Sequence, residues 1–154
     1  MAPRQLSQAG AAFIQQWESL QLVGMLPTPV DAPTAGWGHT GPDVVLGKTY
    51  TMEQINAWFA QDTGWATTDV NDSVEPDITQ HQFDACVSLC FNIGPGDPSH
   101  DIPGWLTSTV LRKINAGDIP GAAEAFKLWT HQNGSFVQGL LNRRTAERAL
   151  FLTP

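Results

Sequence analysis

The sequence lacks the features that mark membrane proteins and exported proteins. In its 154 residues no apolar run reaches the roughly 18 residues that a membrane-spanning helix needs. The first 25 residues contain no basic segment followed by an apolar block and a cleavage site. We therefore expect one domain, made without an export signal, that starts in a cytoplasm and does not insert stably into membranes.

Cysteine is scarce as well. The two cysteines, Cys86 and Cys90, lie four residues apart in a predicted helix, where a disulfide between them would be strained. We expect buried free thiols. The four histidines have no second histidine or cysteine at the spacing of metal ligands, so the sequence predicts neither a metal site nor a cofactor.

Positively charged residues are also few. Lysine and arginine number 8 against 15 acidic residues, and a net charge of -7 argues against nonspecific binding of nucleic acid. Most of the cations follow residue 110. They are either solvated helix faces or a basic end that helps to hold an anionic polymer.

Helical patterns cover most of the chain. An apolar stripe predicts a first helix over residues 5–20, built on Leu6, Ala9, Phe13, Trp17 and Leu20. Two later helices begin with capping boxes, one formed by Thr51 with Gln54 and one by Thr79 with Gln82. Three further helices are predicted: one ending at Gly117, one capped by Asp118, and one closing the chain over residues 135–152.

Two segments are not helical. Residues 22–50 are rich in Pro, Gly, Thr and Val, which predicts a small hairpin sheet. Residues 94–105 are predicted to be a connecting loop. The result is an α+β chain with a helix and a β lobe over about residues 1–50, a larger helical lobe over about residues 51–154, and a cleft between the lobes.

Five stretches resemble one known family: "FIQQWESLQL", "TAGWGHTG", "TQHQFDACVSLCFNIGPG", "STVLRKINAGDIPGAAEAFKLWT" and "GLLNRRTAERALFL". Their order along nearly the whole chain is similar to that in the phage-type lysozymes of glycoside hydrolase family 24. The resemblance implies a lysozyme-like fold and an endolysin that hydrolyses the β-1,4 bond between N-acetylmuramic acid and N-acetylglucosamine in bacterial peptidoglycan, with inversion. The alternative is a catalytically weak relative that binds glycan in a structural role.

Glu18 and Thr34 are the catalytic residues that match the family motifs most directly. Cleavage of a glycosidic bond needs a proton donor for the leaving oxygen and a second polar group that positions water. Glu18 follows Trp17 near the end of a mostly apolar helix, where partial burial favours a carboxyl that keeps its proton. From pattern alone it could equally be a solvated helix-end carboxylate. By resemblance Glu18 is the acid, and the hydroxyl of Thr34 holds the attacking water.

The second carboxylate departs from the family pattern, which is roughly E-x8-D-x5-T. The position nine residues after Glu18 is Pro27, and Asp31 is the only acid between Glu18 and Asp43. Either the longer "PTPVDAP" turn brings Asp31 to the substrate as the base, or Asp31 only stabilises its own turn.

The remaining site residues have supporting roles. The resemblance implies that His39 pairs with Asp62 across the lobes. It also implies that Arg143 or Arg144 reaches Glu18. Trp105, in the predicted loop, is the tryptophan expected to meet sugar. We further expect a monomer that acts on glycan strands of the periplasm or cell wall, released by a separate pore-forming membrane protein.

Overall fold

The computed structural model describes residues 2–154, which form two compact units. One unit comprises residues 12–65, and the other combines the residues up to 11 with residues 66–154. The expected lobe boundary near residue 50 therefore differs from the observed division. The reason lies in helix α2 (Met52–Ser73), whose first part supplies Ile55 to the hydrophobic core of the 12–65 unit.

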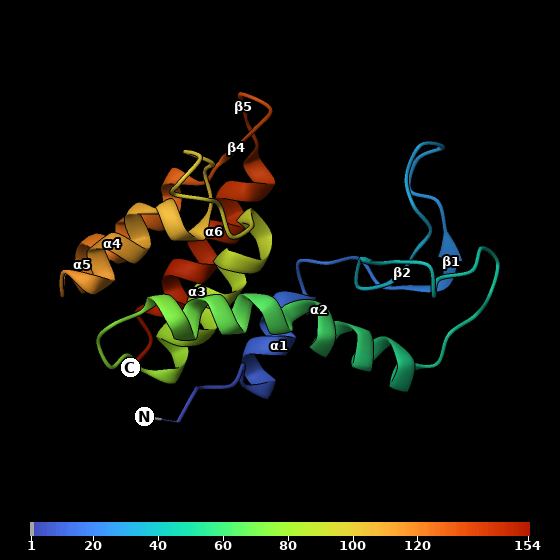
Figure 1. The fold of residues 1–154 in the computed structure, drawn as a ribbon, viewed down its shortest axis with the longest axis horizontal. Coiled ribbons are helices and arrows are strands. Elements are labelled where there is room, and N and C mark those ends of the chain that lie inside the picture. The colour runs from blue at the N-terminus through green and yellow to red at the C-terminus, as the bar shows by residue number, and fades with distance from the viewer. Residues whose placement is uncertain (1) are drawn as a thin grey trace. The chain divides into compact units, whose positions relative to one another are not determined.

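The unit of residues 12–65 is built on a small antiparallel sheet. Its strands β1 (Gln21–Met25), β2 (Thr34–Gly36) and β3 (His39–Thr40) are hydrogen-bonded in chain order, and Figure 1 shows β1 and β2 side by side. This is the hairpin sheet that the sequence predicts. The core beneath it consists of Ala35, Val44, Tyr50 and Ile55, with the partly buried Trp37 and Trp58 packed against them.

Helix α1 (Gln8–Gln15) is much shorter than the predicted helix over residues 5–20. Its buried positions are Gly10 and Ile14, whereas Leu20 is 42% exposed, so the predicted apolar stripe is wrong. Close packing explains the use of glycine: a β-carbon on Gly10 would lie 2.5 Å from Cγ of Asp84. Periodicity detected the helix but not the face that it buries.

Both capping boxes form as predicted. At the start of α2, the Gln54 N–H donates to the Thr51 hydroxyl, and the Thr51 N–H donates to the Gln54 side chain. The same reciprocal pair opens α3 (Gln80–Ile93) at Thr79 and Gln82. Helix α3 ends at Gly94, whose φ of 86° is a conformation that glycine tolerates.

The unit containing residues 66–154 is mostly helical. Besides α3 it contains α4 (Thr109–Asn115), α5 (Ile119–Ala125) and α6 (Gln138–Phe151), with 3₁₀ turns at Trp105–Thr107 and Phe126–Leu128. Helix α3 packs on α6 and α4 packs on α5. Asp118 caps α5 as predicted. Fully or almost fully buried side chains include Phe83, Leu89, Trp105, Ile114, Phe126 and Phe151.

A second hairpin was not predicted. Strands β4 (His131–Gln132) and β5 (Ser135–Phe136) pair around Asn133 and Gly134, which have φ values of 51° and 79°. An Asn-Gly pair is the preferred sequence for such a two-residue turn, so the signal was present in the sequence.

Both thiols have the predicted state. Cys86 and Cys90 are free and buried, and burial raises the pKa of each thiol above its usual value. They therefore behave as small apolar side chains of the α3 core.

Over residues 2–154, every helix is too short or too polar to cross a lipid bilayer.

Candidate active site

Glu18 lies in the turn that connects α1 to β1. Helix α1 ends at Gln15, and the backbone N–H of Glu18 donates to the Gln15 carbonyl at 3.1 Å. This turn directs the chain from the helix into the sheet, so backbone geometry holds Glu18 at the junction. The side chain of Glu18 is partly buried.

The turn between β2 and β3 lies close to the carboxylate of Glu18. Gly36 and Gly38 have φ values of 63° and 83°, in the left-handed region that favours glycine. A β-carbon built on Gly38 would lie 3.9 Å from Oε2 of Glu18. The "GWG" segment thus provides the backbone conformation of the turn and an approach to the acid without a side chain at residue 38.

Thr34 begins β2 and pairs with Thr40 of β3. Its hydroxyl donates to the Ala32 carbonyl at 3.2 Å, which leaves the oxygen lone pairs able to accept a hydrogen bond from a water molecule. The strand therefore fixes the backbone of Thr34, and its role in holding water stays a prediction.

Asp31 lies in the exposed turn between β1 and β2, where its backbone N–H donates to the Thr28 carbonyl at 3.1 Å. Within residues 2–154, its carboxylate has no hydrogen bond or ion pair. The alternative in which this side chain stabilises its own turn therefore has no support in the structure. A catalytic role for Asp31 stays a prediction.

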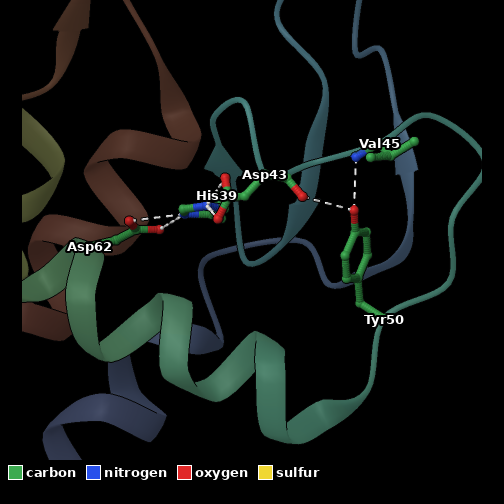
Figure 2. A network of polar contacts seen from close by, with 5 residues as sticks. All are labelled: His39, Asp43, Val45, Tyr50 and Asp62. Atoms are coloured by element: carbon green, nitrogen blue, oxygen red, sulfur yellow. Dashed lines mark hydrogen bonds and ion pairs between the residues drawn. The ribbon is translucent and has the colours of Figure 1, made fainter.

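His39 lies between two carboxylates, as Figure 2 shows. Its Nδ1 is 2.9 and 3.0 Å from the two oxygens of Asp62, and its Nε2 is 3.1 Å from both oxygens of Asp43. A ring that donates from both nitrogens is an imidazolium. The predicted pair with Asp62 is present, but both residues belong to the unit of residues 12–65, so the pair does not join two lobes.

The surroundings of His39 favour its charged form. Burial alone lowers the pKa of His39, but the hydrogen bonds and charges of Asp62 and Asp43 outweigh this effect and raise the pKa above 6.5. The hydrogen bond from His39 in turn holds the pKa of Asp43 below 3.8. The ring of Trp58 stacks on the His39 ring with centroids 4.4 Å apart.

Asp43 was not predicted as a site residue. It follows His39 by four positions in "HTGPD", and the Gly-Pro turn folds it back onto the ring. Gly41 permits this geometry, because a β-carbon there would lie 2.6 Å from Oδ1 of Asp43. Tyr50 fixes the same segment: its hydroxyl donates to the Asp43 carbonyl and accepts from the Val45 N–H, as Figure 2 shows.

Arg143 and Arg144 both bind Glu147 within helix α6. Arg144 lies 2.7 Å from one oxygen of Glu147, and Arg143 lies 3.2 Å from the other. The hydroxyl of Ser88, on α3, donates to the Glu147 carboxylate at 2.7 Å. Arg144 and Glu147 are fully buried, so this cluster ties α6 to α3 in the interior of its unit.

Trp105 does not have its predicted role. Its side chain is 0% exposed, and its indole N–H donates to the hydroxyl of Ser73 at 2.8 Å. A tryptophan enclosed in this way cannot stack on a sugar. The prediction was wrong because the loop folds inward: the Trp105 N–H donates to the Gly94 carbonyl, which brings the indole into the helical core.

The described residues 2–154 include no group of three or more His, Cys, Asp or Glu side chains arranged to hold a metal ion.

Comparison with known proteins agrees with this arrangement. The family model described as phage lysozyme matches residues 15–147. The chain is 39% identical over 115 residues to the SAR-endolysin of Enterobacteria phage P21, and 36% identical over 148 residues to the endolysin of Bacillus phage PZA. A crystal structure of a P22 lysozyme variant superimposes with a TM-score of 0.84 at 35% identity, covering 97% of this chain and 99% of that one.

The chain therefore belongs to the phage lysozyme family. The matches cover 75% and 96% of this chain, but only 66% of the P21 protein and 55% of the PZA protein. The predicted α+β, lysozyme-like fold is confirmed by the similarity to the P22 lysozyme structure.

Proposed function

We propose that this chain is an endolysin of the muramidase type, which hydrolyses the β-1,4 bond between N-acetylmuramic acid and N-acetylglucosamine in bacterial peptidoglycan. One observation carries the proposal: within a member of the phage lysozyme family, Glu18 lies beside the glycine turn of "GWGHT". The resemblance assigns the proton donor to that position. The endolysin and lysozyme relatives favour this function over that of an inactive glycan-binding protein.

In the proposed mechanism Glu18 protonates the oxygen of the leaving sugar as the glycosidic bond breaks. Water attacks the anomeric carbon from the opposite face, so the configuration inverts. Thr34 accepts a hydrogen bond from this water and orients it, and Asp31 takes its proton as the base. The separation that such a base needs is about 6.5 to 9.5 Å from the acid.

The physiological setting belongs to the same proposal. The enzyme acts as a monomer on glycan strands of the cell wall. It reaches them from the host cytoplasm after a separate pore-forming membrane protein opens the inner membrane. Glycan strands are its only partners in this proposal, and it needs neither a metal nor a cofactor.

A turbidity assay on bacterial cells with a permeabilised outer membrane tests the proposal. Glu18→Gln removes the acidic proton while it keeps the size of the side chain, so we expect lysis to slow by about a hundredfold or more. Glu53→Gln, an exposed position in the first turn of α2, is the matched control and should lyse cells like the unsubstituted protein. Near-normal lysis by folded Glu18→Gln would exclude Glu18 as the acid.

A further inference from the structure

The residues on either side of His39 each lie beside a group that the proposed reaction uses. Gly38, which precedes His39, lies beside the carboxylate of Glu18. Thr40, which follows His39, pairs with Thr34 across the sheet. Any displacement of His39 would therefore move the neighbours of the acid and of the water-holding hydroxyl together.

Strand β3 has little support from the sheet itself. It contains only His39 and Thr40 and pairs only with β2, so it lies at the edge of the three-stranded sheet. An edge strand of two residues is too short to hold its own position through backbone hydrogen bonds. The side chain of His39 supplies the missing attachment, because it is 7% exposed and bonded at both nitrogens.

Two different elements hold that side chain. Asp62 comes from α2, and Asp43 comes from the loop that follows β3. Asp62 alone would engage only Nδ1, and the opposite side of the ring would then face solvent. Asp43 engages Nε2 and is itself fixed through its carbonyl by Tyr50.

We propose that Asp43 is a positioning residue for the hydrolysis reaction: together with Asp62 it holds His39 as an imidazolium, and thereby keeps Gly38 beside Glu18 and Thr40 beside Thr34. This inference rests on the proposed function. Asp43 touches no substrate in this account and acts only through His39. The charged groups on the elements packed around His39 are Asp62 on α2, Asp43 in the loop, and Glu18 facing the neighbouring Gly38.

The proposal makes a specific claim about pH. With Asp43 present, His39 stays charged and doubly bonded to higher pH, because a nearby carboxylate stabilises the imidazolium. Without that carboxylate, His39 loses its proton at lower pH and is then held on one side only. In Asp43→Asn, strand β3 should therefore lose its fixed position at a pH where it is still held in the unsubstituted protein.

The test is the pH profile of Asp43→Asn on purified peptidoglycan. We expect the decrease of kcat at alkaline pH to begin at a lower pH than in the unsubstituted protein. On the alkaline side of the profile kcat should be roughly tenfold lower, because a misplacement of about 1 Å can cost up to a hundredfold. KM should change by less than about twofold, because no substrate contact is removed. At pH values low enough for His39 to be protonated in both proteins, kcat should approach that of the unsubstituted enzyme.

Two matched variants keep the test decisive. Asp43→Glu keeps the carboxylate and should recover most of the alkaline activity, whereas Glu53→Gln removes one negative charge elsewhere in the same unit and should leave the profile unchanged. The titration of the His39 ring, followed by NMR, should have a lower midpoint in Asp43→Asn than in the other two variants. The side chain of Asp43 is 50% exposed, so we expect the substituted protein to fold.

Two results would overturn the proposal. One is an unchanged pH profile of kcat in Asp43→Asn, and the other is a loss of kcat that is equal at all pH values, since that would mark a structural role only. Failure of the proposed function is distinguishable, because the unsubstituted protein would then release no sugar from peptidoglycan at any pH.

Discussion

Two clusters of bonded charges within residues 2–154 differ in exposure and in what they can do. In the unit of residues 12–65, His39 is held by two partly exposed carboxylates whose side chains are 29% and 50% accessible. In the other unit, Arg144 and Glu147 are 0% exposed and lie against Arg143 and Ser88. One cluster is centred on a histidine, whose pKa its carboxylate partners raise, and the charged members of the other are arginine and glutamate.

The two clusters therefore have different roles: one holds two helices together, and the other responds to protonation. The buried arginine–glutamate cluster contains no histidine, and it ties α6 to α3 through the hydroxyl of Ser88. The His39 cluster responds to protonation and lies one residue from the neighbours of Glu18 and Thr34. We infer that the unit of residues 12–65 loses stability as pH rises through the folded pKa of His39.

The largest effect on stability is expected from the buried cluster. Glu147→Gln would remove the carboxylate that the fully buried Arg144 binds, and such a change costs about 3 to 5 kcal/mol. Chemical denaturation at several pH values between 5 and 9 should give nearly the same loss at each. Glu75→Gln, at an exposed position of the same unit, should change the unfolding free energy by less than about 0.5 kcal/mol. A strong pH dependence of the Glu147→Gln effect would contradict the contrast between the clusters.

A smaller, pH-dependent effect is expected for Asp62→Asn. The folded pKa of His39 is raised, so its stabilisation is fully present below 6.5 and is lost as pH rises through the folded value. Near pH 6 the substitution should cost about 2 kcal/mol, the usual range for a hydrogen bond to a charged group. The cost should shrink on the alkaline side, because the unsubstituted protein then loses the same interaction.

At low pH the stability that this cluster contributes depends on Asp43. Its folded pKa is lowered, so its contribution is present above 3.8 and is lost as pH falls through the folded value. Stability arising from the cluster should therefore be greatest between about pH 4 and 6.5. A double-mutant cycle of His39→Gln with Asp62→Asn, measured near pH 6, checks this. Coupling that is absent near pH 6, or that grows toward pH 9, would contradict the assignment.

The smallest effect on stability is expected at Asp31. Its carboxylate is exposed and lacks a partner within residues 2–154, so Asp31→Asn should change the unfolding free energy by less than about 0.5 kcal/mol. If Asp31 is the base, turnover should nevertheless fall steeply. Unchanged turnover in a protein of unchanged stability would remove Asp31 from the mechanism, and the base would have to be found elsewhere.

Local signals were the part of the structure that the sequence predicted well. The capping boxes at Thr51 and Thr79 and the cap at Asp118 depend on residues three positions apart, and all of them form. Glu18 and Thr34 could be named because short motifs around them match the family, and the sheet holds Thr34 as a strand residue.

Features that depend on distant parts of the chain could not be predicted. Trp105 is buried because the loop before it folds tightly: a β-carbon built on Gly96 would lie only 2.7 Å from the backbone nitrogen of Gly104. Asp43 reaches His39 only through the turn geometry at Gly41, and composition gives no sign of it. Glu147 binds the two arginines within its own helix, but its bond to Ser88 depends on the packing of α3 on α6.

Analysis of the cleaved glycan tests the central claim most directly. Purified peptidoglycan digested by the unsubstituted protein, reduced with borohydride and examined by mass spectrometry, should carry new reduced ends on N-acetylmuramic acid. In a separate digest that is not reduced, NMR should show the α-anomer as the first product, as inversion of a β bond requires. Glu18→Gln should generate no such ends above background, while Glu53→Gln should match the unsubstituted protein. New ends on N-acetylglucosamine, or undiminished cleavage by Glu18→Gln, would contradict the account.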